Sequence, residues 1–294
     1  MLPNNKRYIS AIHSLHGSGT METCRGFHTV EELNSTIVFD MNQPLITLSN
    51  RKLGYRFACA EAAWILSGDN RVSTIKPYSK QIEHFSDDGM LFYGAYGPKI
   101  VDQLSYVIKA LADDTSSRQA VLNIWREKPG KSKDIPCTLS AQFMIRNDKL
   151  HVINTMRSSD IWLGVPYDLF NFSMLAAYVA IALKEYHNKK VDLGDIYMNA
   201  GSRHFYMDES DFGYGLKHIT DVIINGTIED FSYKPINLDL FNDPEEIVDH
   251  LWNLAKFGFS QEEGNIPGSF LTNEMHVYYE LKRKRKQYEI CQGE

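Results

Sequence analysis

The apolar run at residues 168–182 constrains the fold of this chain more than any other segment. It reads Asp-Leu-Phe-Asn-Phe-Ser-Met-Leu-Ala-Ala-Tyr-Val-Ala-Ile-Ala, which is too long for a strand and is rich in helix formers. The run therefore predicts a largely buried helix, with Asp168 as its acidic N-cap. A chain of 294 residues is long enough to enclose such a helix in a large core.

Two further helices are predicted upstream. Residues 58–66 form an apolar stretch that carries Glu61 and Trp64, and Gly68 with the two polar residues after it ends the helix. Residues 101–112 place apolar side chains at helical spacing before two aspartates, which is typical of an amphipathic helix that ends in a polar turn.

The chain between residues 120 and 156 changes to strand patterns. Residues 120–125 read as a strand, and residues 139–146 and 149–156 read as a hairpin with Asn147-Asp148 as its tight turn. Helices and strands alternate irregularly, which indicates an α/β (α+β) protein with a mixed sheet. No linker or repeat interrupts residues 1–294, so we expect one domain.

The composition is that of a soluble globular protein. Hydrophobic residues make up 43% and charged residues 23% of the chain. We find no apolar stretch approaching the roughly 18 residues that cross a bilayer, and no apolar signal segment follows the N-terminus. We therefore expect a cytoplasmic protein without a membrane role.

The cysteines and the charge exclude other classes of site. Cys24, Cys59, Cys137 and Cys291 show no Cys-x-x-Cys spacing, which argues against a zinc knuckle, a metal site of this type or a disulfide framework. The net charge of -6 gives no general attraction to nucleic acid. A basic run at 282–286 is the local exception, and we interpret it as a solvated helix end.

A set of short motifs between Glu61 and Tyr206 resembles, in order and spacing, the thymidylate synthases and their hydroxymethylase relatives. These enzymes use folate to modify C5 of pyrimidine nucleotides. The motifs are Glu61-Ala-Ala-Trp64, Gly68-Asp69-Asn70, Tyr96-Gly97, Ser117-Arg118-Gln119, Pro136-Cys137, Gln142-Phe143, Arg157-Ser158-Ser159-Asp160, Leu163-Gly164-Val165-Pro166 and His204-Phe205-Tyr206. The resemblance covers about half of the chain and implies a mixed twisted sheet flanked by helices.

The resemblance implies that Cys137, at the start of the predicted hairpin, attacks C6 of the pyrimidine. Arg157, just beyond the hairpin, and Arg118 would bind the phosphate and lower the pKa of the thiol. In this family the Ser-Arg element reaches into the neighbouring subunit, so we expect a homodimer with the sheet at its interface. Gln119 stands where relatives often have a second arginine.

Other residues are expected to hold the nucleotide. His204 and Tyr206 match the pair that contacts the sugar hydroxyl, and Ser158 keeps a pattern of members that use deoxynucleotides. Arg25 is our candidate for an N-terminal phosphate arginine. Glu61 corresponds to the glutamate that organises water and protons, and its apolar helix should raise the pKa of the carboxyl.

Asp168 differs from the residue that the synthases have at this position, and the difference bears on which base is recognised. It falls where thymidylate synthases carry the asparagine that reads uracil. An amide can donate to O4 and accept from N3–H, whereas an ionised carboxylate can only accept. Cytosine presents an amino donor in place of O4, so Asp168 favours cytosine. The same carboxylate would stabilise cytosine protonated at N3 when C6 is attacked.

Two elements that favour hydride transfer in the synthases are absent here. No Ile-Trp-x-x-Trp segment occurs between Arg71 and Gly89, and residues 291–294 differ from the short apolar tail that closes the synthase site. With Asp168, these departures predict that 5,10-methylenetetrahydrofolate and water convert dCMP to 5-hydroxymethyl-dCMP, as in phages with modified DNA. The expected folate contacts are Asp160, Leu163, Gly164 and Tyr167.

Three alternatives stay open at this point. CMP could replace dCMP as the substrate. The chain could instead act on dUMP, either as a hydroxymethylase or as a synthase that makes dTMP. An inactive relative could bind nucleotide or RNA through the basic run at 282–286.

Overall fold

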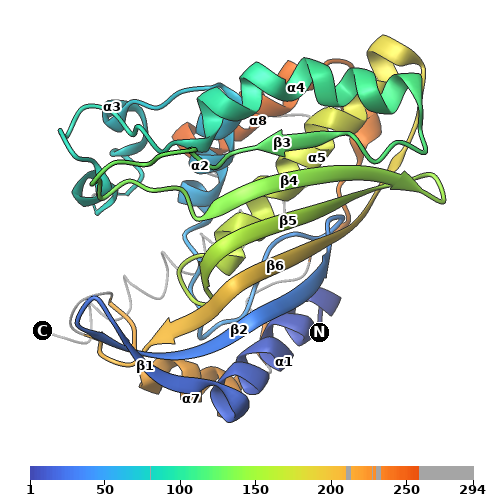
Figure 1. The fold of residues 1–294 in the computed structure, drawn as a ribbon. Coiled ribbons are helices and arrows are strands. Elements are labelled where there is room, and N and C mark those ends of the chain that lie inside the picture. Colours follow the sequence, from blue (N-terminus) through green and yellow to red (C-terminus); the bar gives the residue numbers. More distant parts are fainter. Residues whose placement is uncertain (80, 210–212, 227, 230–232, 258–294) are drawn as a thin grey trace, which may run out of the picture.

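The computed structural model describes residues 1–79, 81–209, 213–226, 228–229 and 233–257 (Figure 1). The basic run at 282–286 and the tail at 291–294 lie outside the described residues.

A six-stranded mixed sheet forms the centre of the fold (Figure 1). Its strands are β1 (Thr20–Cys24), β2 (Phe27–Asp40), β3 (Val121–Asn123), β4 (Thr138–Arg146), β5 (Lys149–Asp160) and β6 (Asp192–Tyr206), in the order β1-β2-β6-β5-β4-β3. Neighbouring strands are antiparallel except β5 and β6, which are parallel. The predicted α/β class with a mixed sheet is confirmed.

Helices flank the sheet. They are α1 (Pro3–Ser18), α2 (Tyr55–Leu66), α3 (Val72–Ile75), α4 (Tyr96–Asp113), α5 (Val165–His187), α7 (Leu216–Asn225) and α8 (Pro244–Phe257), with short 3-10 turns η1 (Ile82–Phe85) and η2 (Leu238–Leu240). Helix α5 packs against β5 and β6, and α2, α4 and α8 pack against α5. Helices α1 and α7 lie together beside the β2 end of the sheet (Figure 1).

The predicted hairpin is the joined pair β4 and β5. Asn147 and Asp148 both have positive φ, 51° and 57°, which is the geometry of a two-residue type I′ turn. Strand β5 continues four residues past the expected end, so Arg157 lies within the strand and not beyond it. The predicted strand at 120–125 is shorter than expected and retains only three residues, as β3.

Helix α5 begins three residues before its predicted start. Gly164 is the N-cap, and Pro166 occupies the first turn, where its missing N–H removes no hydrogen bond. Asp168 lies inside the helix and its amide donates to the carbonyl of Gly164 at 2.9 Å. The prediction that Asp168 caps the helix is therefore wrong, because Gly164 occupies the N-cap position.

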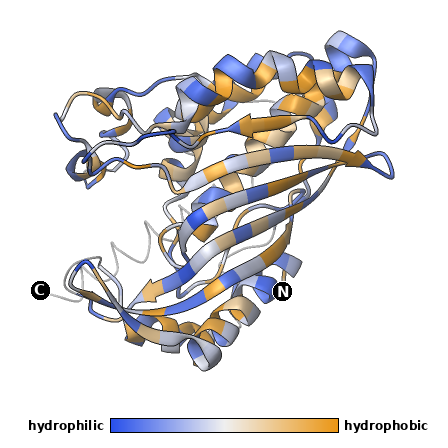
Figure 2. Ribbon diagram, viewed as in Figure 1, coloured by the Kyte–Doolittle hydropathy of each residue, from blue (hydrophilic) through white to orange (hydrophobic). Residues whose placement is uncertain are grey.

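Length and apolar composition alone would let α5 cross a bilayer, contrary to our expectation that no segment is long enough. However, 83% of its most apolar window is buried inside the protein. Figure 2 shows this helix in mostly hydrophobic colours, whereas the colours alternate along β4 and β5, whose two faces have different surroundings. Burial identifies α5 as a core helix.

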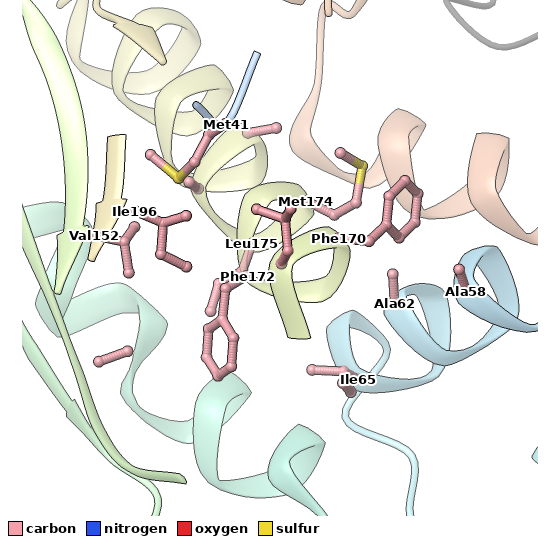
Figure 3. Packing of buried hydrophobic residues seen from close by; sticks show 14 of the residues in the cluster. Met41, Ala58, Ala62, Ile65, Val152, Phe170, Phe172, Met174, Leu175 and Ile196 are labelled. Atoms are coloured by element: carbon pink, nitrogen blue, oxygen red, sulfur yellow. The ribbon is translucent and has the colours of Figure 1, made fainter. Parts of the chain in front are cut away.

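The core lies between α5, the sheet and α2 (Figure 3). Side chains from the three layers meet there: Phe170, Phe172 and Leu175 of α5, Val152 and Ile196 of the sheet, and Ala58, Ala62 and Ile65 of α2. As predicted, α2 stops near Gly68, which has a φ of 67°. A Cβ on Gly97 would lie 2.9 Å from the carbonyl of Ile65, so glycine lets α4 begin directly against the end of α2.

Candidate active site

Cys137 lies immediately before β4, where Arg157 of the neighbouring strand holds its backbone. The amide of Arg157 donates to the Cys137 carbonyl at 2.8 Å. The guanidinium donates from Nε to the Pro136 carbonyl at 2.9 Å and from Nη2 to the Ile135 carbonyl at 3.0 Å. Nη2 is also 3.7 Å from the thiol Sγ. The expected pairing of nucleophile and arginine is thus present in one chain.

The thiol of Cys137 is half-buried, and burial raises its pKa above the ordinary value. The positive charges of Arg157 and Arg25 lower the pKa, while the carboxyl groups of Asp168 and Asp160 raise it. Arg157 thus lowers the pKa as predicted, but in the free protein loss of hydration outweighs the cations. Arg25 is the second cation of the same chain that acts on the thiol.

Replacing Arg157 with glutamine should make Cys137 less reactive. Without the nearby cation the thiolate is less stable, so we expect alkylation by iodoacetamide near neutral pH to slow by roughly tenfold, equivalent to about one pKa unit. Arg146→Gln is the matched control, because Arg146 also donates to backbone carbonyls but lies at the far end of β4. Equal alkylation rates in wild type and Arg157→Gln would contradict the assignment.

A cavity of about 220 Å³ opens between α2, α4 and α5. Glu61 of α2 and Asp168 of α5 both line it, together with Trp64, Tyr96 and Asn171. Oε2 of Glu61 accepts a hydrogen bond from Nδ2 of Asn171 at 2.8 Å. Burial raises the pKa of Glu61 to about 7, and the Asn171 hydrogen bond opposes this shift. The predicted rise is confirmed, although the carboxyl has a partner.

Asp168 has the more strongly shifted carboxyl. Burial and then the nearby charge of Glu61 raise its pKa to about 8, while the positive charge of Arg203 opposes the rise. Arg203 is a core residue of β6, only 1% exposed, whose guanidinium donates to Ser159 Oγ at 2.7 Å and to the Met198 carbonyl at 2.8 Å. The sequence prediction of an ionised Asp168 therefore does not hold for the free protein near neutral pH.

The expected sugar and phosphate residues gather beside this region. His204 and Tyr206 alternate along β6, and their rings meet edge to face at 5.3 Å, so they point the same way as predicted. Arg25, at the turn between β1 and β2, hydrogen-bonds the Tyr206 side chain and so lowers the tyrosine pKa. Burial nevertheless leaves that pKa above its usual range. Ser158 lies in β5 opposite Ser202.

Arg118 and Gln119 lie away from this chain's own thiol. Both side chains are exposed just before β3, and the Arg118 carbonyl accepts from Gln142 Nε2 at 2.8 Å. Gln142 is five residues along β4 from Cys137, a span of roughly 17 Å in an extended strand. Arg118 therefore does not belong to the group that surrounds Cys137 in the same chain.

The four predicted folate residues surround the start of α5. Asp160 accepts hydrogen bonds from the amides of Trp162 and Leu163 and from the hydroxyl of Tyr214, at 2.7, 2.8 and 2.7 Å. Its carboxylate is thus already engaged in shaping the turn.

The other three have different surroundings. Leu163 is 39% exposed, and a Cβ on Gly164 would meet the Asp160 carbonyl at 2.9 Å. The Tyr167 hydroxyl accepts from the amide of Gly54 at 3.1 Å.

Sequence reasoning missed Asn171 and Arg203. Asn171 is a polar residue in an apolar helix, three positions after Asp168 and so on the same face, which is a signal that could have identified it. Its Oδ1 is buried and has no partner among the described residues. Arg203 gave no comparable signal, because its burial depends on how β5 and β6 pair.

Comparison with known proteins agrees with this geometry. The sequence model described as thymidylate synthase matches residues 6–222. The chain belongs to the thymidylate synthase family. The family comprises folate-dependent enzymes that transfer one carbon to pyrimidine nucleoside monophosphates, and the predicted family is confirmed.

Two phage proteins are similar to this member of the thymidylate synthase family. A deoxyuridylate hydroxymethyltransferase of Bacillus phage SP01 is 31% identical over 195 residues, which are 60% of this chain and 48% of that protein. A deoxyuridylate hydroxymethyltransferase of Pseudomonas phage M6 is 36% identical over 134 residues, which are 42% and 38%. The matched region thus spans less than half the length of each relative.

Proposed function

We propose that this protein transfers the one-carbon unit of 5,10-methylenetetrahydrofolate to C5 of dCMP and adds water, giving 5-hydroxymethyl-dCMP and tetrahydrofolate in the cytoplasm. The observation that carries the proposal is the position of Asp168. Its carboxyl lines the same cavity as Glu61, and its charge acts on the Cys137 thiol. The proposed base-reading carboxyl therefore shares a cavity with the proposed proton-transfer group and lies close enough to the proposed nucleophile for its charge to act on it.

The chain's own residues account for the nucleotide chemistry. The Cys137 thiolate would form a bond to C6, which places negative charge on C5 and prepares it to attack the one-carbon unit. Arg157 and Arg25 would hold the phosphate and Tyr206 with His204 the sugar, keeping C6 in line with the thiol. Asp168 would accept a hydrogen bond from the cytosine amino group, with one proton held between its second oxygen and N3.

The cavity fits a heterocycle that both donates and accepts hydrogen bonds. Nε1 of Trp64 and Oδ1 of Asn171 are buried without partners among the described residues, and both belong to residues that line the cavity. A reduced pterin ring offers acceptors and donors for such atoms. When bound, methylenetetrahydrofolate supplies the one-carbon unit. Glu61 would then take a proton from the water that adds to this carbon.

The proposal includes a homodimer. Arg118 is exposed and lies away from Cys137 of its own chain, so a second copy would have to carry it into the site. An arginine supplied in this way would add a third cation for the phosphate. Residues 1–294 would act as one catalytic domain.

Product mass tests the proposal directly. We expect purified protein with methylenetetrahydrofolate to add one hydroxymethyl group to dCMP without forming dihydrofolate. A methylated product with dihydrofolate would indicate a synthase instead. Preferred turnover of CMP would show that the substrate is the ribonucleotide. Tight RNA binding without modification of any pyrimidine nucleotide would show that the protein is an inactive relative that binds RNA.

A second candidate substrate is dUMP. The two phage relatives are both deoxyuridylate hydroxymethyltransferases, and this supports uracil as the base. The same assay with dUMP distinguishes the candidates, since turnover of dUMP alone would exclude dCMP.

A further inference from the structure

We propose that Asp168 reads the base as a neutral carboxylic acid, and that this lets one site accept both cytosine and uracil nucleotides. The inference rests on the proposed function and goes beyond it, because it replaces a choice between dCMP and dUMP with recognition of both.

The described surroundings of Asp168 lack the hydrogen-bond donors that stabilise an ionised carboxylate. No hydrogen bond to its side chain occurs among the described residues, although it lines the cavity beside Glu61. Asp160, eight residues earlier at the end of β5, accepts three hydrogen bonds. A buried carboxylate without donors is costly, whereas a neutral acid is far less so. Burial raises the pKa of both carboxyls, but hydrogen bonds oppose the rise at Asp160 and none among the described residues does so at Asp168, so Asp160 is the better suited of the two to hold a negative charge.

The acidic groups on two neighbouring elements also favour the neutral form of Asp168. Glu61 of α2 and Asp160 of β5 both disfavour a negative charge on Asp168. Tyr96 of α4 and Cys137 before β4 also interact with it, and burial raises the pKa of both. Both groups are therefore neutral near neutral pH, and neither a phenol nor a thiol can carry a positive charge.

Arg203 of β6 is the one cation that acts on Asp168 among the described residues. Its guanidinium is already bonded to Ser159 and Met198. The balance leaves the pKa of Asp168 at about 8, with burial and Glu61 as the main causes.

A neutral acid can match either base without moving. Cytosine offers a donor at N4 and an acceptor at N3, and uracil offers an acceptor at O4 and a donor at N3. The acid has one donor O–H and one acceptor oxygen, and the proton can sit on either oxygen. With cytosine the oxygen facing N3 carries the proton, and with uracil the oxygen facing O4 carries it. An asparagine would need to rotate its amide by about 180° to make the same exchange.

The test measures nucleotide affinity on Cys137→Ser protein, which removes the chemistry. Calorimetry with dCMP and with dUMP from about pH 7 to about pH 9 avoids titration of the phosphate. We expect both nucleotides to bind with affinities within about tenfold, and both affinities to fall together above about pH 8, towards tenfold per pH unit. Asp168→Asn in the same background should lose this fall and favour one base by about tenfold or more.

Proton uptake provides a second measurement that does not need the asparagine variant. Near pH 8.5 each nucleotide should take up a similar fraction of one proton, measured from binding heats in buffers of different ionisation enthalpy. Binding of one nucleotide alone would overturn the inference, as would a constant affinity across this pH range. Failure of the product assay with normal binding would instead overturn the proposed function and leave base reading intact.

Discussion

Cys137→Ala should abolish turnover of every pyrimidine nucleotide while largely sparing nucleotide binding. Alanine cannot form a bond to C6, so C5 is never activated, and loss of a nucleophile of this kind costs on the order of 10⁴-fold or more in kcat. Arg157 still bonds the carbonyl groups of residues 135–137, which do not depend on the thiol. Single-turnover product mass and nucleotide calorimetry measure the two effects separately.

Cys59→Ala is the matched control for this experiment. Cys59 lies in α2, is only 1% exposed, and burial raises its pKa to about 12, so it cannot act as a thiolate near neutral pH. We expect this variant to keep turnover. Activity retained in Cys137→Ala, or lost equally in both variants, would remove Cys137 from the role of nucleophile.

Local sequence signals were enough to predict the hairpin and the core helix. Asn147 and Asp148 tolerate the positive φ that a two-residue turn requires, so the turn and the register of β4 with β5 could be read directly. The apolar run of α5 is too long for a strand, which left a buried helix as its interpretation. Its start was misplaced because an aspartate near a helix start resembles a cap.

The long strands β2 and β6 carried weaker signals. Strand β2 contains two charged residues, Glu31 and Glu32. Asn34 has a φ of 54° and interrupts the pairing of β2 with β6. No simple alternation runs through such a strand, so we assigned no element there. Arg203 was missed for a related reason, because a charged residue becomes buried there only through pairing of two distant segments.

The site was predicted from residue identity more successfully than from electrostatics. Motifs located Cys137, Arg157, Glu61 and Asp168 in one region, which the structure bears out by hydrogen bonds, cavity lining and mutual charge effects. The protonation of these groups could not be read from the sequence, because it depends on burial and on distances across α2, α5 and the sheet. Asp168 was therefore treated as ionised, and the effect of burial on the Cys137 thiol was not anticipated.

Glu61→Gln should lower kcat/KM by roughly 10²–10⁴-fold, the usual contribution of a proton-transfer group. Glutamine keeps the size of the side chain and can still bond Asn171, but it cannot accept a proton from water. The pKa of Glu61 is about 7, so wild-type kcat/KM should rise with pH as this carboxyl ionises, until loss of the Asp168 proton lowers nucleotide affinity above about pH 8. The variant should lack this rise. The pH profile of kcat/KM for both proteins measures the effect.

Stability separates this catalytic role from a structural one. Burial raises the folded pKa of Glu61 from 4.5 to about 7, so folding favours its protonated form. The stability that this provides is fully present below about pH 4.5 and is lost as pH rises through about 7. Glu61→Gln should therefore unfold at a higher urea concentration than wild type near pH 8.

The matched control, Glu185→Gln, changes a surface carboxylate 3.0 Å from Lys184 and should alter neither property. A variant that gains stability yet keeps its turnover and its pH profile would show that Glu61 is a buried acid without a part in proton transfer. A variant that loses turnover and gains stability at high pH would show that the energetic cost of burying this carboxyl is retained because the reaction needs it to accept a proton.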